Sequence, residues 1–155
     1  MYRNASFQDW KAVYELICEM EDTRLPPERF AAIFQSQLQD PRYTCLVCEC
    51  DGRVAGVLNL RFEEQLHHAG WVAEIMEFAV APAYRSRGIG KGMLAHARRL
   101  AEESGCILIE VACNQRRTDA HRFYQREGMR SSHYKFSKPL TDEALPETAC
   151  REAGE

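Results

Sequence analysis

Two glutamates, Glu74 and Glu77, stand in an otherwise apolar and β-prone stretch that runs from Trp71 to Val80. A carboxylate in such a strand is a candidate general base, acting directly or through a water molecule. The two acids are three residues apart, so an unbroken strand would point their side chains to opposite faces. We therefore expect only one of them to reach a given cleft, and a β-bulge would change which one does. Pairing of either acid with an Arg or Lys at the strand edge is the alternative.

A glycine-rich segment follows this strand and opens a helix. Gly88 and Gly90 permit positive φ and close approach of an anion to the backbone, and Arg85, Arg87 and Lys91 add positive charge. Backbone N–H groups at a helix N-terminus point the same way, and the helix dipole adds about half a positive charge there. The sequence therefore predicts a phosphate-binding loop.

Two other phosphate-binding motifs fit this loop less well. A Walker loop needs a glycine where Arg85 stands and Ser or Thr where Gly92 stands. A dinucleotide fingerprint needs a third glycine at Met93. Glu110 nevertheless lies about twenty residues beyond Gly90, where an acid that binds the ribose is expected, so the dinucleotide interpretation stays open.

Length and composition are those of one globular domain. The chain has 155 residues, a net charge of −3 and a pI near 6.0, which argue against nucleic acid or an anionic membrane as the main partner. No apolar run approaches the roughly twenty residues of a membrane span, and no signal peptide precedes Tyr2. We expect a soluble, cytoplasmic protein.

The seven cysteines are an odd number, scattered through apparent core segments, which favours reduced thiols over a disulfide framework. Cys45, Cys48 and Cys50 could hold a metal only if they converged. In a strand from Tyr43 to Cys50, however, Cys48 and Cys50 share one face and Cys45 points to the other. We expect buried or half-buried thiols here.

The hydrophobic pattern predicts the elements that position these residues. Ser6 to Asp9 resembles a capping box that starts one helix, and Pro26-Pro27 starts a second, which ends at Asp40-Pro41. Asp51-Gly52 predicts a hairpin turn. The predicted strands are 2–5, 43–50, 53–62, 71–80, 106–113 and 130–138, with a loop at 63–70, a helix from the glycine loop to 104 and a short helix at 118–126. Residues 141–155 carry five acids and one Arg and are expected to be a mobile tail.

The pattern Val80-x-Pro82-x-x-Arg85-x-x-Gly88-x-Gly90, in this order of elements, resembles the GNAT N-acetyltransferases over residues 1–140. The resemblance implies a domain of class α+β, layered α/β/α, whose mixed and mostly antiparallel sheet has a central, splayed pair of parallel strands. The pantetheine arm of acetyl-CoA lies in that gap. The coenzyme contacts that the resemblance implies come from Phe78, Ala79, Val80, Arg85, Ser86, Arg87, Gly88, Ile89, Gly90, Lys91, Asn114 and Tyr124.

Longer segments resemble one subgroup, the aminoalkylphosphonate N-acetyltransferases. These segments are residues 13–19, 62–77, 119–128 and 132–138, whereas the second helix shows little that matches. The subgroup transfers acetyl to small amines that carry a phosphonate and is described as needing a divalent metal. The resemblance therefore implies such an acceptor, and the metal and its ligands stay open.

Acetyl transfer from a thioester to an amine needs a neutral nitrogen, yet an alkylamine with a pKa of about 10.4 is mostly protonated at pH 7. Glu74 or Glu77 is the expected base, and Glu74 is preferred because it shares strand parity with Phe78 and Val80. The Val80 N–H would hold the oxyanion. The resemblance places Tyr124 where GNAT enzymes carry the general acid for the coenzyme sulfur, and core packing is its alternative role.

A phosphonate dianion needs cations or hydrogen-bond donors at the acceptor end. Arg61, His67, His68 and Lys135 are the candidates, within a wider set of Arg116, Arg117, His121, Arg130 and His133 whose convergence the sequence does not settle. Adjacent histidines in a strand-like segment point in opposite directions, so His67 and His68 are a poor metal pair by themselves. One His with Glu74 and the phosphonate could form an open metal site, and solvated loop histidines are the alternative.

We therefore expect an acetyl-CoA-dependent N-acetyltransferase of residues 1–140, with a tail at 141–155, that acts on an aminoalkylphosphonate by direct attack of the amine. Covalent catalysis through Cys113 is a further possibility. The alternatives are a GNAT enzyme for another small amine or a protein amine, and a module that binds acetyl-CoA without turnover. The expected partner is a small-molecule amine, with neither nucleic acid nor a membrane, and a homodimer is left open.

Overall fold

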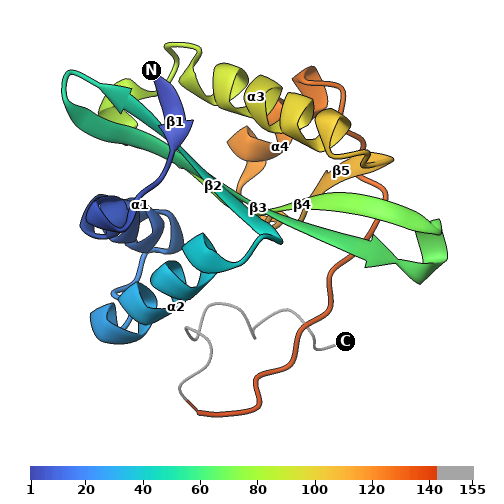
Figure 1. The fold of residues 1–155 in the computed structure, drawn as a ribbon, viewed down its shortest axis with the longest axis horizontal. Coiled ribbons are helices and arrows are strands. Elements are labelled where there is room, and N and C mark those ends of the chain that lie inside the picture. The colour runs from blue at the N-terminus through green and yellow to red at the C-terminus, as the bar shows by residue number, and fades with distance from the viewer. Residues whose placement is uncertain (143–155) are drawn as a thin grey trace. The chain divides into compact units, whose positions relative to one another are not determined.

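Five strands pair into one sheet in the order β1-β2-β3-β4-β5 (Figure 1). The computed structural model describes residues 1–142. The chain divides into two units, Met1–Gln115, which contains the whole sheet, and a second unit that starts at Arg116. The elements are β1 (Tyr2–Asn4), η1 (Phe7–Asp9), α1 (Trp10–Glu21), α2 (Pro27–Gln39), β2 (Tyr43–Cys50), β3 (Arg53–Gln65), η2 (Leu66–His68), β4 (Gly70–Val80), η3 (Pro82–Tyr84), α3 (Ile89–Glu103), β5 (Leu108–Val111) and, in the second unit, α4 (Thr118–Arg126).

The sheet is mixed and mostly antiparallel, as the sequence predicted. β1, β2, β3 and β4 pair antiparallel in succession, whereas β4 and β5 pair parallel through the α3 crossover. Asp51 and Gly52 join β2 to β3 with φ values of 52° and 71°. A two-residue type I′ turn requires positive φ at both positions, so the hairpin prediction is confirmed.

The face of the sheet that carries α1 and α2 is apolar at one end. Val47, Val57 and Ala79 from the three central strands pack there against Val13 and Phe34 from the two helices. These side chains are almost completely buried. The cluster fixes α1 and α2 on this face, where they cover only part of the strands.

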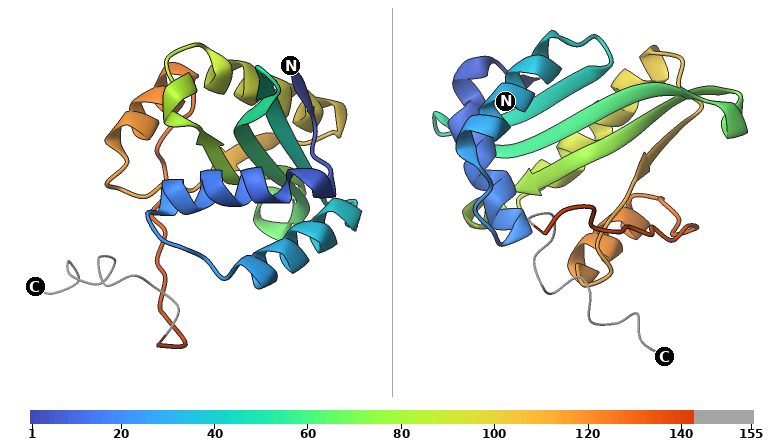
Figure 2. Two further views of the ribbon diagram at one scale, coloured as in Figure 1. Left: turned by 90° about the vertical axis from the view of Figure 1, so that its left-hand side faces the viewer. Right: turned by 90° about the horizontal axis from the view of Figure 1, so that it is seen from below.

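The opposite face of the sheet carries α3 (Figure 2). Met93 and Ala97 on the inner side of this helix are fully buried. A Cβ at Gly56 of β3 would come within 2.8 Å of the Met93 sulfur, so the glycine allows close approach of helix and strand. The first unit therefore has helices on both faces of its sheet. Within residues 1–142, no helix is both long enough and apolar enough to cross a membrane.

The predicted final strand at residues 130–138 does not form, and this segment has no regular secondary structure. Its aromatic side chains are exposed, 82% for Tyr134 and 92% for Phe136. An alternating pattern stabilises a strand only where the apolar side is buried against neighbours, and that burial is missing here. The parallel pair β4–β5 consequently lies at the edge of the sheet and not at its centre.

Other boundaries differ less from the prediction. β5 covers four residues instead of 106–113, and β3 continues into the predicted loop as far as Gln65. The β3–β4 hairpin is therefore paired from Gly56 and Val80 to Gln65 and Gly70, next to its tip. The predicted tail at 141–155 lies, from residue 143 onward, outside the described residues.

Candidate active site

The predicted phosphate-binding loop lies between β4 and α3. Gly88 is the N-cap of α3, with a left-handed φ of 79°. The helical hydrogen bonds begin with the Gly92 N–H and the Gly88 carbonyl, at 3.0 Å. The N–H groups of Ile89 to Lys91 therefore precede the helical ladder and point out of the helix end. A Cβ on Gly88 would meet no atom within 4 Å, so open space lies beside the N-cap. This geometry suits an anion.

The arginines of the loop are held by nearby groups. Arg85 donates from Nε to the Val80 carbonyl at 3.0 Å, which ties the loop to the end of β4. The Arg87 guanidinium lies 5.3 Å from the centre of the Tyr84 ring. Ser86 between them has a φ of 61°, a conformation that is uncommon for a residue with a side chain. The loop is thus tightly folded and carries positive charge.

The strand before this loop separates from its parallel neighbour. β4 and β5 pair only over Val72–Ile75 and Leu108–Val111. Beyond Ile75, β4 continues to Val80 in register with β3. The end of β4 that leads into the loop is therefore the part that has left β5, which is the arrangement expected of a splayed pair.

The backbone at this end of β4 is turned toward the side of β5. The Ala81 N–H donates to the Ala55 carbonyl at 2.8 Å, next to the Gly56–Val80 pair. In an antiparallel ladder the hydrogen-bonded pairs alternate with pairs whose backbone groups point outward. The N–H and C=O groups of Phe78 and Val80 therefore point away from β3, and those of Ala79 toward it.

A β-bulge in β4 changes the relation between the two strand acids. Glu77 pairs with Asn59 and Glu74 pairs with Arg61, so Met76 is the extra residue of β4. Asn59 and Arg61 are two residues apart and share one face of β3, and their partners share it too. The prediction that only one acid could reach a given face is therefore wrong. The parity argument for Glu74 fails for the same reason.

Glu74 is part of an ion-pair cluster. The Arg61 Nη2 atom lies 2.8 Å from Glu74 Oε2 and 3.2 Å from Glu63 Oε1. Pairing with an arginine was the alternative role for either strand acid, and it describes Glu74. Arg61, a candidate for the acceptor phosphonate, is shared here between two carboxylates.

Glu77 is held by the side-chain amide of Asn59. Asn59 donates from Nδ2 to Glu77 Oε2 at 2.9 Å and to Gln37 Oε1 at 2.9 Å. Burial raises the pKa of the Glu77 carboxyl above its ordinary value, the Asn59 hydrogen bond opposes that change, and the charge of Glu21 adds to it. A carboxyl whose pKa lies closer to neutrality is the better proton acceptor at pH 7.

Polar side chains continue along the same face toward the tip of the β3–β4 hairpin. Gln65 donates from Nε2 to Glu63 at 3.0 Å and to Glu110 of β5 at 3.1 Å. Glu110, considered from the sequence only as a possible ribose acid, thus lies opposite Glu74 on the neighbouring strand. Arg61 and Glu110 were named from the sequence in other roles, whereas Asn59, Glu63 and Gln65 were not named. The missed signal was the period-two polar series Asn59, Arg61, Glu63 and Gln65.

The two histidines stand together at the hairpin tip. His67 and His68 lie in the 3-10 turn η2, with their ring centres 4.2 Å apart. The expectation that they point oppositely is wrong, because the segment is a turn and not a strand. His68 Nδ1 is 2.8 Å from Gln65 Oε1. Within residues 1–142, no group of three or more His, Cys, Asp or Glu side chains is arranged to hold a metal ion, so the residues present do not form a protein-only metal site.

The cysteines of β2 have the orientations that the strand pattern predicted. Cys45 packs in the core beneath α1 and α2, whereas the Cys48 and Cys50 sulfurs lie 3.8 Å apart. Burial raises the pKa of the Cys45 thiol to about 12. The six described cysteines are free thiols.

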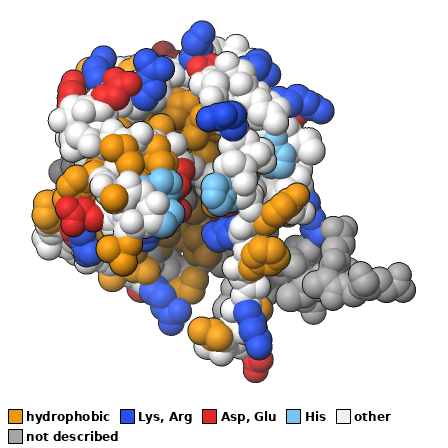
Figure 3. All heavy atoms as spheres, turned by 90° about the vertical axis from the view of Figure 1, so that its right-hand side faces the viewer, with side chains coloured by type: hydrophobic (Ala, Val, Ile, Leu, Met, Phe, Trp, Pro, Cys, Tyr) orange, Lys and Arg blue, Asp and Glu red, His pale blue; other side chains and the backbone are white. Residues whose placement is uncertain are grey.

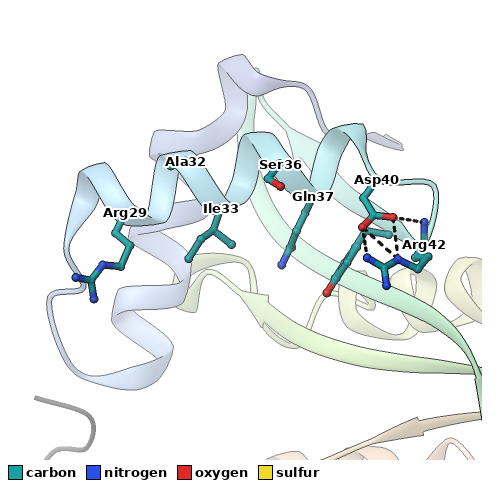
Figure 4. A pocket seen from close by; sticks show the side chains of 8 residues that line it. Arg29, Ala32, Ile33, Ser36, Gln37, Asp40 and Arg42 are labelled. Carbon is teal, nitrogen blue, oxygen red and sulfur yellow. Dashed lines mark hydrogen bonds and ion pairs between the residues drawn. The ribbon is translucent and has the colours of Figure 1, made fainter. Parts of the chain in front are cut away.

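A pocket of about 440 Å³ runs along α2 and the start of β2 (Figure 4). Gln37 lines this pocket and also accepts the hydrogen bond from Asn59. Asp40 and Arg42 close one end with an ion pair of 2.7 Å. Ile33 is 52% exposed and lines the pocket.

The remaining candidates lie after β5. Asn114 is in the segment that follows this strand, at the end of the first unit. In the second unit, Tyr124 is on α4 beside Phe123, with ring centres 5.3 Å apart. Lys135 is exposed in the segment without regular structure. These positions do not test the roles predicted for Asn114, Tyr124 and Lys135, which stay predictions.

Charged side chains of both signs occupy the surface shown in Figure 3. Lys and Arg are interspersed there with acidic, polar and hydrophobic side chains.

The chain matches known acetyltransferases along most of its length. Residues 10–129 match the acetyltransferase (GNAT) family. The chain is 40% identical to the aminoalkylphosphonate N-acetyltransferase of Salmonella typhimurium over 138 residues, which cover 89% of this chain and 90% of the relative. It is 26% identical to an uncharacterized N-acetyltransferase of Mycobacterium bovis, over 75% of this chain and 69% of the relative.

Solved structures share the fold. A transcriptional regulator from Bacillus halodurans has a TM-score of 0.84 and 25% identity, covering 90% of this chain and 99% of that one. AAC(6')-Iy, solved with a bisubstrate analogue of coenzyme A, has a TM-score of 0.80 and 16% identity, covering 91% of this chain and 98% of that one. The sequence match, the mixed sheet and the glycine loop at the start of α3 agree, and this chain belongs to the GNAT family of acetyltransferases.

Proposed function

We propose that this acetyltransferase moves the acetyl group of acetyl-CoA onto the primary amine of a small aminoalkylphosphonate. The identity of 40% to the Salmonella typhimurium enzyme, which extends over nearly the whole of both chains, carries the choice of acceptor. The proposed reaction is a direct attack in a ternary complex. The amine nitrogen bonds to the thioester carbon, the carbon–sulfur bond breaks, and the coenzyme leaves as a thiolate.

The glycine loop is the proposed coenzyme site. The N–H groups at the start of α3 and the open space beside Gly88 fit the linked phosphates of the coenzyme. The outward backbone groups of Val80 and Phe78 then face the pantetheine arm where β4 leaves β5. In this arrangement the Val80 N–H is the donor for the oxyanion that forms in the transition state.

Glu77 is the proposed general base. Its burial, which raises the carboxyl pKa, and its amide partner leave it better suited to take a proton than Glu74, whose charge is held by Arg61. The proton comes from the ammonium group of the acceptor, since a neutral nitrogen is needed for attack. Glu74 then serves with Arg61 to shape the charged face beside the base.

The leaving thiolate needs a proton, and Tyr124 is the proposed donor. This role rests on the family resemblance and on the position of Tyr124 in α4. Coenzyme contact by Asn114 is proposed on the same basis.

The acceptor end of the site is proposed to bind both charged groups of the aminophosphonate, the ammonium and the phosphonate. The four acids Glu63, Glu74, Glu77 and Glu110 along one face of the sheet suit an ammonium group before it is deprotonated. Arg61, His67, His68 and Lys135 are the candidates for the phosphonate. No step is assigned to a metal ion. A divalent metal held by one His, Glu74 and the phosphonate stays a possibility, since such an open site needs fewer than three protein ligands.

The free cysteines suit a reducing compartment, and we propose a cytoplasmic location. The proposed partners are acetyl-CoA and a small amine. The domain is proposed to extend over residues 1–140.

Release of free thiol from acetyl-CoA tests the reaction directly. We expect turnover with aminomethylphosphonate or aminoethylphosphonate, measured with and without a chelator, and little with a polyamine or a cationic peptide. Turnover of the polyamine or peptide alone would move the acceptor to another amine. Coenzyme binding without thiol release from any of them would indicate a binding module.

Gly88→Ala tests the coenzyme loop, and Gly105→Ala is its matched control. Both glycines have a positive φ, 79° and 77°, and a Cβ at either would meet nothing within 4 Å. Both variants therefore carry similar backbone strain, of about 1–2 kcal/mol. We expect weaker coenzyme A binding by calorimetry only for Gly88→Ala, because only that methyl group enters the proposed phosphate site. Equal binding by both variants would contradict the assignment of the loop.

A further inference from the structure

Asn59 is a buried polar residue in the middle of β3. It is 7% exposed, and among the polar and charged residues of the described chain only Asp9, at 8%, is buried to a similar extent. The two Nδ2 hydrogens of Asn59 are directed to Gln37 Oε1 and Glu77 Oε2, each at 2.9 Å. Because both partners are acceptors, the amide has one orientation that satisfies them.

This orientation leaves the other side of the amide unsatisfied. Asn59 Oδ1 is buried and has no hydrogen-bond partner within residues 1–142. A buried acceptor without a partner is destabilising, and an apolar residue of the same shape would avoid that cost. Packing alone therefore does not account for an asparagine here, whereas a need for its two donors does.

Gln37 supports Asn59 from α2. Its side chain lines the pocket along that helix (Figure 4), and its Oε1 atom accepts the hydrogen bond from the buried Asn59 amide. Gln37, Asn59 and Glu77 thus form a second row of hydrogen-bonded side chains, called the row below, which runs from the pocket to the Glu77 carboxylate. Its three members come from α2, β3 and β4.

Few charged groups compete with this row. Glu21 of α1 acts on Glu77 through its charge, and Cys45 of β2 is a neighbouring thiol. The Arg61–Glu74 pair is the next polar pair along the same face of the sheet. Asn59 donates the hydrogen bond to the Glu77 carboxylate.

We propose that Gln37 and Asn59 are positioning residues that hold the Glu77 carboxylate in the orientation from which it takes the proton of the acceptor amine. This inference rests on the proposed function, which assigns the base to Glu77. Asn59 acts on Glu77 directly, and Gln37 acts through Asn59. Because the Asn59 donor favours the charged carboxylate, its loss makes Glu77 harder to ionise.

Asn59→Leu keeps the branched shape of the side chain and removes its donors. We expect the acid limb of the kcat/KM profile to move to higher pH by about one unit, the size expected for one hydrogen bond to a carboxylate. Gln37→Met, on the partly exposed helix, is expected to move the limb in the same direction by less. The double variant is expected to match Asn59→Leu, because Gln37 has no effect once Asn59 is gone.

Titration of the Glu77 carboxyl by ¹³C NMR, assigned with Glu77→Gln and recorded without acceptor, separates this inference from the proposed function. An upward shift of the Glu77 titration in Asn59→Leu and in Gln37→Met, together with the moved acid limb, supports the inference. An unchanged titration in both variants overturns it, whatever the activity. A shifted titration with an unmoved limb overturns the assignment of Glu77 as the base, and the catalytic role of the row with it. If Asn59→Leu does not fold, Gln37→Met carries the same test.

Discussion

Glu74 and Glu77 are the same residue type on the same face of β4, and their surroundings give them different properties. Arg61 faces Glu74 at 2.8 Å, and the Asn59 amide faces Glu77 at 2.9 Å. Glu74 is therefore ion-paired, whereas Glu77 lies beside a neutral amide, and burial raises the pKa of the Glu77 carboxyl. A carboxylate with a raised pKa is suited to accept a proton near pH 7.

Glu77→Gln should separate activity from stability. We expect kcat/KM to fall by about 10²- to 10⁴-fold, the usual contribution of a general base. The raised pKa of Glu77 means that its contribution to stability is fully present below its ordinary pKa and is lost as pH rises through the folded-state pKa. The variant should therefore unfold at a higher temperature than the wild-type protein at pH 8. Thermal unfolding between pH 4 and 8 checks this, and a lower midpoint at pH 8 would contradict it.

At the scale of elements, the β-bulge in β4 decides which acidic side chains share a face of the sheet. One extra residue, Met76, moves Glu74 onto the face of Glu77 and brings Arg61 opposite Glu74. The same strand keeps its regular register with β3 from Glu77 to Val80, which sets the outward backbone groups near the loop. A single local insertion in the pairing thus sets the side-chain row without disturbing the backbone end of β4.

The junction of β1 and α1 depends on another buried acid. Arg3 makes a two-pronged ion pair with Asp9 at 2.8 and 2.9 Å, and Asp9 also accepts the Ser6 N–H at 2.7 Å. The Arg3 hydrogen bond lowers the pKa of Asp9, so its stabilising contribution is present above the ordinary carboxyl pKa and is lost as pH falls through the folded-state value.

Asp9→Asn should therefore destabilise the protein near neutral pH by about 1–3 kcal/mol. The difference in unfolding free energy between the variant and the wild-type protein should shrink as the pH falls below the pKa of an ordinary carboxyl group. Chemical unfolding at pH 7 and pH 3 measures both values. Glu15→Gln is the control, because the side chains of its ion pair with Arg24 are 62% and 65% exposed and are expected to contribute little. An equal loss of unfolding free energy in the two variants would contradict a stabilising role for the Arg3–Asp9 ion pair.

At the scale of the whole molecule, coenzyme binding should be visible as stability. A ligand that binds only the folded state at a hundred times its Kd adds about 2.7 kcal/mol. For a chain of this size, that corresponds to an increase in Tm of roughly 5–10 °C. Thermal unfolding with coenzyme A, and with NAD in parallel, measures it. An increase with NAD alone would favour the dinucleotide interpretation of the glycine loop.

Local signals in the sequence were sufficient for much of the fold and for the proposed coenzyme loop. Asp51-Gly52 specifies a hairpin, and Gly88 specifies the start of α3, through backbone preferences of residues that are neighbours in the chain. Segment 130–138 was an exception. Its alternating pattern is a local property, but a strand also needs a neighbouring element that buries its apolar side, and Tyr134 and Phe136 are exposed.

Only the tertiary structure decided the arrangement of the acids. The contacts that distinguish Glu77 from Glu74 join residues 18 and 13 positions apart, and Gln37 lies 22 positions from Asn59. A β-bulge is a property of the pairing between two strands, and the spacing of residues within one strand does not reveal it. The sequence therefore determined which residue types were available for acetyl transfer, and strand register, which depends on distant partners, determined which of them meet.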